Sequence, residues 1–262
     1  MISLTSVQID AWINALIFPL ARILGFINTA PLWSSAGVSR RIRLMLGIAL
    51  TLGIMFVLPP MPELKPGSGP GMWVLSQQVL IGMAMGFAVR VIFAAVDIAG
   101  AYISMQMGLG FATLYDPQNT AQTPVLSSFL TLLTLLVFLS MNGHLIYVGV
   151  LVRSFEVIPV GINTLSPDSW LNLVRLGSQL FSMGLLLALP VLIAQLITSL
   201  TLGILTRAAP QLNVFSIGFP ISLTMGFIGI LLGLHYLPVP LERMFNIAAE
   251  AALDFAVLRP PR

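Results

Sequence analysis

Between Arg175 and Glu242 the chain carries one charged residue, Arg207. This arginine lies in a polar break, residues 206–213, between two apolar runs that contain no Asp, Glu, Lys or Arg. The runs cover residues 176–206 and 208–241. A membrane-spanning helix needs about 20 apolar residues to cross about 30 Å of hydrocarbon, so both runs are long enough. The pattern predicts a helical hairpin inside a lipid bilayer.

The composition of the whole chain agrees with this prediction. Hydrophobic residues make up 57% and charged residues 8%, against about 25% charged in ordinary soluble domains. The small excess of 12 Lys and Arg over 9 Asp and Glu does not form the clustered basic face that nucleic-acid binding requires. The absence of Cys excludes disulfides, thiol catalysis and Cys-based metal sites.

Further apolar segments predict a polytopic protein of the all-α class. We expect helices near residues 11–32, 44–58, 72–89 and 125–152, and an amphipathic helix in the tail, 238–262. Breaks are expected at the Pro-rich linker 59–71, the polar loop 116–124 and the loop 153–168. The pattern leaves open whether the Gly-rich apolar stretch 99–115 crosses the membrane, re-enters it or leaves it.

The orientation rests on one cluster of cations, Arg40, Arg41 and Arg43. By the positive-inside rule this cluster is expected in the cytoplasm, with residues 1–10 outside. Residues 1–10 hold no cation and one anion, Asp10, unlike the positive start of a secretory signal. We therefore expect a retained first helix.

Arg90 and Asp97 are charges within otherwise apolar sequence. They are seven residues apart, two helical turns, and so share one face of a helix. Intramembrane charges are expensive and mark functional or structural contacts. Two interpretations are open: an ion or proton relay, or pairing of each charge with a neighbouring helix in an assembly. We favour pairing, because a relay usually needs more acids than this chain has.

The chain offers no convergent catalytic or metal-binding set. His144 and His235 are its only histidines, and a metal site needs several convergent ligands. No G-x-S-x-G elbow frames a serine, and no phosphate-binding G-x-x-x-x-G-K-[ST] loop is present. We expect no enzyme, no metal and no cofactor.

Two sequence features indicate close packing and adaptable surfaces. Gly82 with Gly86, and Gly229 with Gly233, have the GxxxG spacing that permits close helix approach. Methionines, which adapt to irregular partners, gather around the Gly-rich segment at 83, 85, 105 and 107. Ordinary packing explains both features, and a compliant constriction in a pore is the sharper alternative.

Residues 105–110, Met-Gln-Met-Gly-Leu-Gly, run towards Asp116 and Pro117 between apolar helices. Such a segment cannot face lipid, because its backbone groups would be unsatisfied there. It must face protein, water or a lumen. The sequence therefore indicates that the protein lines a conduit.

Three stretches resemble the FliR family, the flagellar branch of the type III secretion export-gate proteins. The first is Met-Gly-Leu-Gly at 107–110 through Asp116-Pro117. The second is Asn-Gly-His at 142–144, followed by Ser-Phe at 154–155 and Pro-Val-Gly at 159–161. The third is Arg-Ala-Ala-Pro-Gln-Leu-Asn-Val-Phe at 207–215 through Gly-Phe-Pro at 218–220. The length and hydropathy profile match as well, so the resemblance covers nearly the whole chain.

The resemblance implies a fold of long, tilted or kinked helix hairpins. Residues 1–168 would form a FliP-like part, 169–237 a FliQ-like hairpin and 238–262 an amphipathic tail, all within one integrated unit. The implied function is non-enzymatic: a pore-forming subunit of the flagellar export gate, which passes unfolded flagellar subunits across the bacterial inner membrane at the basal body. The implied partners are FliP-like and FliQ-like subunits, FlhB, FlhA and the exported chains.

The resemblance also assigns residues to two sites. A pore plug falls on residues 106–122. The side chains implied to form the seal are Met105, just before the plug, and Met107, Leu109, Phe111 and Leu114. Gln106, Gly108 and Gly110 belong to the same segment, and Asp116 and Pro117 would fix its turn. The hairpin tip, expected to contact FliQ or FlhB, comprises Arg207, Pro210, Gln211 and Asn213.

Three alternatives remain at this stage. A homologous subunit of a virulence secretion system has the same composition. A small-solute channel or secondary transporter would be favoured by internal repeats or paired acids at depth, and neither is visible. A membrane enzyme would need the catalytic set that the chain lacks.

Overall fold

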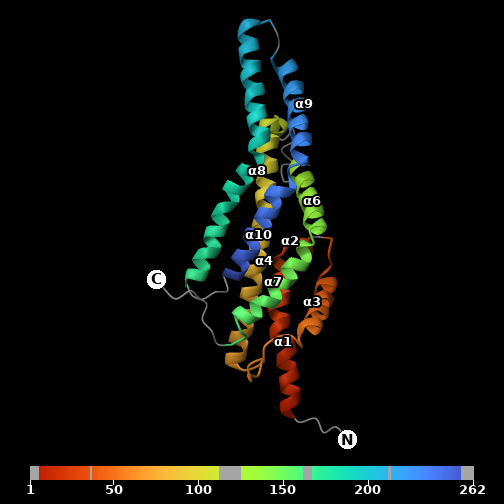
Figure 1. Cartoon of the computed structure of the whole chain (residues 1–262), viewed down its shortest axis with the longest axis vertical. Helices are drawn as coiled ribbons and strands as arrows, with labels where there is room; N and C mark the ends of the chain where they lie inside the picture. Colours follow the sequence, from red (N-terminus) through yellow and green to blue (C-terminus); the bar gives the residue numbers. More distant parts are fainter. Residues whose placement is uncertain (1–5, 36, 112–124, 162–166, 212–213, 255–262) are drawn as a thin grey trace. The chain divides into compact units, whose positions relative to one another are not determined.

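The computed structural model describes residues 6–35, 37–111, 125–161, 167–211 and 214–254, and helices dominate all of these ranges (Figure 1). The all-α prediction is confirmed. The elements in order are α1 (Ser6–Thr29), α2 (Pro31–Ser34), α3 (Arg40–Ile54), α4 (Gly69–Gln106), the 3-10 turn η1 (Leu109–Phe111), α6 (Val125–Ser140), α7 (Gly143–Val157), α8 (Pro167–Ala208), α9 (Val214–Leu234) and α10 (Pro238–Asp254).

Four of the described helices are long and apolar enough to cross a membrane. They contain the segments Ala11–Thr29, Gly69–Gln106, Asp168–Ala208 and Ser216–Leu234. A fifth span is possible if α6 and α7, which meet at a bend of 69°, cross together. The prediction of an integral membrane protein is confirmed. With 15 residues, α3 reaches only about 22 Å and is too short to span.

The structure corrects two helix boundaries. The segments 72–89 and 99–106 belong to one continuous helix, α4, of 38 residues, because Arg90 and Asp97 interrupt the apolar pattern but not the backbone hydrogen bonding. The expected single helix over 125–152 is instead two helices. They break at Asn142, a non-glycine residue in the left-handed region with φ 55°.

Other boundaries follow the sequence pattern. The Pro-rich linker lies between α3 and α4, and the polar break ends α8 at Ala208, with a turn at Pro210 and Gln211. The amphipathic tail is α10, which buries Leu241, Phe245 and Ala248 and exposes charged residues between them. The helix α7 extends to Val157 and so takes in the start of the loop expected at 153–168.

The chain packs as two compact units whose stretches alternate along the sequence. Unit 1 comprises residues 1–91, 142–177 and 245–262, and unit 2 comprises residues 92–141 and 178–244. In unit 1 a core of Phe18, Val74, Phe155 and Val160 is covered by side chains of the Pro-rich linker and its neighbours. In the same unit the hydroxyl of Tyr147 on α7 donates to the carbonyl of Phe245 on α10, at 2.9 Å.

The helices α1 and α4 approach each other closely in unit 1. A Cβ atom added to Gly82 would overlap the carbonyl oxygen of Arg22, and one added to Gly86 would lie 2.8 Å from the carbonyl oxygen of Phe26. Gly25 of α1 faces the same seam, with the carbonyl oxygen of Val79 at 2.5 Å from its added Cβ. The GxxxG prediction at 82 and 86 is thus confirmed, and its partner is α1.

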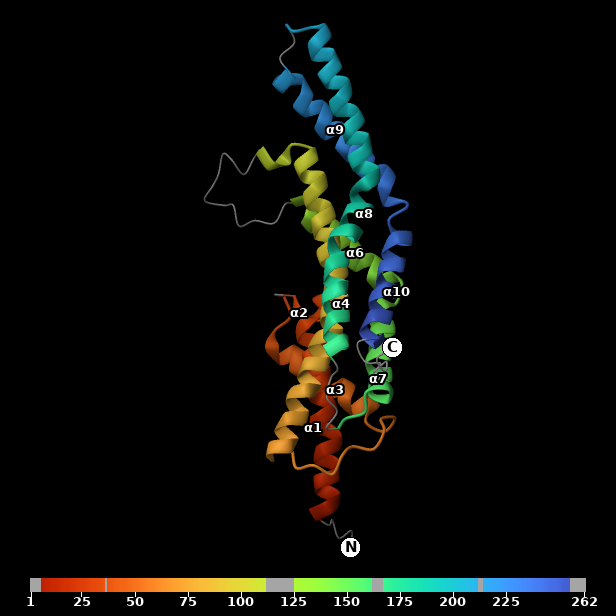
Figure 2. The same ribbon diagram turned by 90° about the vertical axis from the view of Figure 1, so that its left-hand side faces the viewer.

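Unit 2 is built around the C-terminal half of α4. Ser127 of α6 donates to the backbone carbonyl of Asp97 at 2.9 Å, and Phe93 packs edge-on against Phe138 with ring centroids 6.2 Å apart. Within this unit α9 lies next to α8 (Figure 1), and its ribbon crosses that of α8 in the view of Figure 2. At the second GxxxG pair only Gly229 meets a neighbour, Val191 of α8, whereas Gly233 has none within 4 Å of an added Cβ.

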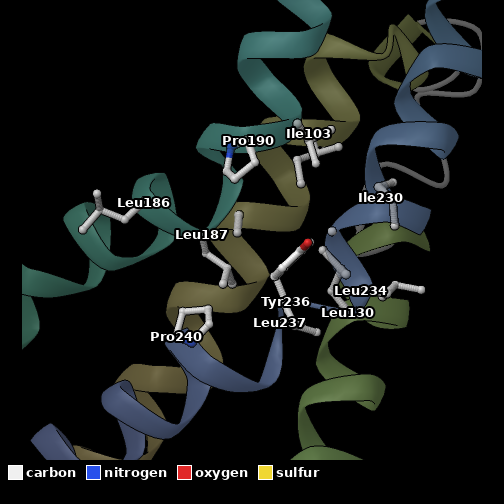
Figure 3. Close-up of a pocket in the computed structure, with 13 residues that line it drawn as sticks. Ile103, Leu130, Leu186, Leu187, Pro190, Ile230, Leu234, Tyr236, Leu237 and Pro240 are labelled. Carbon is white, nitrogen blue, oxygen red and sulfur yellow. The ribbon is translucent and has the colours of Figure 1, made fainter.

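An apolar cavity of about 220 Å³ lies inside unit 2 beside Pro190 of α8. Its wall includes Ile103 of α4, Leu130 of α6 and Ile230 of α9, all directed towards one space (Figure 3). Proline cannot donate a backbone hydrogen bond to the preceding turn. The cavity therefore coincides with a weak point in the hydrogen bonding of α8.

We expect Gly82→Val to lower the free energy of unfolding by about 3 kcal/mol, because the new side chain meets backbone rather than flexible atoms. Thermal unfolding of the purified chain in mild detergent measures the effect. The matched control is Gly203→Ala in α8, where nothing lies within 4 Å and the change should be neutral or slightly stabilising. Equal stability of the two variants would contradict close α1–α4 packing.

Candidate functional site

The chain leaves α4 through a tight helix end. The amide of Met107 donates to the carbonyl of Ile103 at 2.9 Å, and the amide of Gly108 donates to the carbonyl of Met105 at 3.0 Å. Gly108 has φ 81°, a conformation that glycine adopts without the penalty other residues incur. The residues that follow form η1. Gly108 therefore ends α4 and starts the segment to which the plug was assigned.

The two methionines at this helix end have opposite environments. Met105 is 71% exposed, whereas Met107 is fully buried. The side chain of Met107 fills the space that a Cβ at Gly226 of α9 would occupy, and Gln195 of α8 closes the same space from 2.6 Å. Met107 therefore anchors the end of α4 to the α8–α9 hairpin, and Met105 is free to meet another molecule.

Gln195 joins α8 to α9 through a reciprocal pair of hydrogen bonds with Ser222. The Gln195 Nε2 donates to the Ser222 carbonyl at 2.8 Å, and the Ser222 hydroxyl donates to Gln195 Oε1 at 3.0 Å. The same hydroxyl lies 3.5 Å from the carbonyl of Gln106. Because a polar group in an apolar environment is costly when unpaired, this pair fixes the register of the hairpin beside the exit of α4.

The other residues assigned to the plug divide between described and undescribed parts of the chain. Leu109 is partly buried, and Gly110 is exposed. Phe111 ends η1. Leu114, Asp116 and Pro117 lie outside the described residues, as does Asn213 of the hairpin tip. The remaining tip residues Arg207, Pro210 and Gln211 are all exposed at the end of α8.

Asp97 and Arg90 do not pair with each other. The carboxylate of Asp97 accepts a short hydrogen bond from the hydroxyl of Thr131 on α6, so its partner is a polar side chain of a neighbouring helix in the same chain. Arg90 is exposed. A contact between Arg90 and another subunit stays a prediction.

Sequence reasoning missed a polar residue with several hydrogen bonds, Arg22 of α1, which is completely buried. Its Nε donates to Gln78 Oε1 of α4 at 2.8 Å. Its Nη1 donates to the carbonyl and the hydroxyl of Ser154 at 2.9 and 3.0 Å, and its Nη2 donates to the carbonyl of Ile158 at 2.9 Å. The guanidinium group also lies 4.0 Å from the ring centre of Phe155.

The acceptors of Arg22 explain how a cation is tolerated here. Two of them are carbonyl groups at the C-terminal end of α7, where the helix dipole is negative. The Ser154 carbonyl also accepts the last helical hydrogen bond, from the Ile158 amide, whereas the Ile158 carbonyl lies beyond the helix. The planar fork of donors satisfies several oxygens at once, and the Phe155 ring adds a cation–π contact. The available signal was the lone charge inside an otherwise apolar helix.

The histidines have unremarkable surroundings. His144 near the start of α7 is partly buried, and its Nδ1 atom is buried without a hydrogen-bond partner. His235 is exposed, and its ring lies edge-on to that of Tyr236, with the ring centroids 5.4 Å apart. Within the part of the chain that the structure describes, no group of three or more His, Asp or Glu residues could hold a metal ion.

Comparison with known proteins decides the family. The model of the family described as "Bacterial export proteins, family 1" matches residues 13–248. The chain belongs to this bacterial export family. It is 40% identical to "Flagellar biosynthetic protein FliR" of Escherichia coli (strain K12), over 98% of this chain and 100% of that protein.

More distant members match over nearly the same length. The protein of the same name from Pectobacterium carotovorum subsp. carotovorum is 37% identical over 97% of both chains. The one from Bacillus subtilis (strain 168) is 27% identical over 93% of this chain and 95% of its own. The chain is therefore a member of a flagellar export-apparatus family over its whole fold.

We expect Arg22→Met to lower the free energy of unfolding by about 3 kcal/mol, because several buried oxygens lose their donors at once. Arg22→Lys should fall between this variant and the wild type, since an ammonium group cannot reproduce the fork. Thermal unfolding in detergent measures both. The control is exposed Arg90→Met, expected to change stability by less than about 0.5 kcal/mol; an Arg22→Met chain as stable as the control would refute the role of Arg22.

The contact between Met107 and Gly226 predicts a coupled pair of substitutions. Gly226→Ala should lower stability by about 1–3 kcal/mol through overlap with Met107. Adding Met107→Ala should recover part of this loss, so a double-mutant cycle should show coupling. Gly233→Ala, where an added Cβ meets nothing within 4 Å, is the control and should show no coupling with Met107→Ala. Additive effects at 107 and 226 would argue against the anchor.

Proposed function

We propose that this chain is a pore-forming subunit of the flagellar type III protein export gate, which passes unfolded flagellar subunits across the bacterial inner membrane. The observation that carries the proposal is the end-to-end match with proteins named as flagellar biosynthetic proteins. The flagellar names of these relatives favour the flagellar role over the virulence alternative. The proposed role is conduction of protein chains, not catalysis.

The surface of the α8–α9 hairpin supports assembly with other subunits. Only 22% of the apolar segment of α8 and 11% of that of α9 are buried within the chain. Surfaces this apolar need lipid or protein to cover them. We propose that FliP-like and FliQ-like subunits cover part of this hairpin, that Arg207, Pro210 and Gln211 contact FliQ or FlhB, and that FlhA lies nearby at the basal body.

The end of α4 supports a conduit beside this hairpin. Met105 is exposed and has a flexible side chain, whereas Met107, two residues on, is anchored. A compliant apolar side chain on a rigid support suits a seal that must admit varied polypeptides. We propose that Met105 faces the passage and that residues 106–122 form the plug, with Met107 holding its first part in place.

The test is native mass spectrometry of the tagged chain, purified in mild detergent after co-expression with its genomic neighbours, combined with photo-crosslinking from position 105. We expect one copy of the chain within a larger complex, and crosslinks from 105 to a stalled export substrate. A crosslinker at exposed Arg153 serves as the control. A stable monomer free of partners would refute the assembly, and crosslinks from 105 to subunits or lipid alone would refute its place in the passage.

A further inference from the structure

The helix α3 presents an uncovered apolar stripe. Ile42, Met45 and Leu52, together with Phe56 just beyond the helix end, are between 50% and 88% exposed. With Ala49 they follow one another at steps of three and four residues, so they share one face of the helix. The opposite face packs on α1, where the side chain of Leu24 lies 2.6 Å from an added Cβ at Gly47.

All charges of α3 lie at its start. Arg40, Arg41 and Arg43 occupy the first turn, and residues 44–54 carry none. Arg43 donates to the carbonyls of Ser34 and Ser35 at 3.3 and 3.1 Å, while its Nε is buried without a partner. Arg40 and Arg41 are exposed, and within the described ranges neither has a carboxylate partner.

This arrangement is unfavourable for an isolated helix in water. The N-terminus of a helix carries partial positive charge, so three guanidinium groups there are destabilised by the dipole and by one another. An anion bound at this end would interact favourably both with the helix dipole and with the guanidinium groups. The stripe likewise exposes large side chains that need an apolar environment.

We infer that α3 is a lipid-binding element: Arg40 and Arg41 bind the phosphate groups of anionic phospholipids, and the stripe lies against their acyl chains. Charge and apolar surface are separated along the helix axis, as headgroups and hydrocarbon are separated along the normal of a bilayer. A helix that docked on a partner in a coiled coil would instead carry charges at the positions flanking its stripe. At about 22 Å, α3 enters the bilayer beside α1, a candidate span, without crossing it.

The headgroup contact can be tested by lipid retention. The purified full chain, incubated with phosphatidylglycerol or phosphatidylcholine in mild detergent, is examined by native mass spectrometry. We expect selective retention of phosphatidylglycerol, and roughly 30-fold weaker retention in Arg40→Gln/Arg41→Gln, equivalent to about 1 kcal/mol for each arginine. The control Arg153→Gln/Arg243→Gln removes two arginines exposed elsewhere and should retain the lipid. Equal binding of both lipids, or equal loss in both double variants, would overturn the inference.

The acyl-chain contact can be tested by spin labelling, because the chain contains no native Cys. A label at Met45→Cys is measured in the co-expressed complex, in bilayers of phosphatidylglycerol and phosphatidylcholine. We expect frequent collisions with oxygen and few with a water-soluble nickel chelate. The control is Glu63→Cys, at an exposed position in the Pro-rich linker. A label there should collide often with the nickel chelate and rarely with oxygen. Protection from both reagents would mean that a partner protein covers the stripe, and high nickel access would place it in water; either result overturns the inference.

Discussion

The buried guanidinium group of Arg22 links three helices of unit 1. Arg22 contacts α4 through Gln78 and the end of α7 through Ser154 and Ile158. In lipid no water can satisfy these groups, so each must find a partner inside the protein. The positive charge is spread over uncharged oxygens and an aromatic face. Arg22 thereby fixes where α7 ends relative to α1 and α4.

Close backbone approach makes this arrangement possible. Lipid tails are as apolar as leucine side chains, so burial of apolar surface alone drives little association between helices in a membrane. Small residues at Gly25, Gly82 and Gly86 let α1 and α4 pack through dispersion contacts instead. In unit 2 the same physics brings Gly226 against Met107, and the Gln195–Ser222 pair sets the register that this contact requires.

Much of the helical pattern could be predicted from the sequence, because apolar runs and helix breakers act locally. The runs that became α1, α8 and α9, the amphipathic α10 and the polar break with its turn at residues 210 and 211 were all expected. The break at Asn142 was not expected, although Asn followed by Gly is a local turn signal. The course of the chain after Asp97 was left open by the pattern, and the structure continues α4 to Gln106, with the Asp97 carboxylate bonded to Thr131, which is distant in sequence.

The candidate site shows the same division. The Gly-rich exit of α4 and the polar hairpin tip were recognisable from residue types alone. The sequence by itself determined that the chain is helical, membrane-embedded and similar to export proteins, since hydropathy and motif order are properties of the linear chain. Only the tertiary structure decided that Met107 is an anchor while Met105 is exposed, and that Arg22 is a structural centre. Those assignments depend on contacts between groups that are distant in the sequence, Met107 with Gly226 and Arg22 with the end of α7. The local sequence around each residue does not encode such contacts.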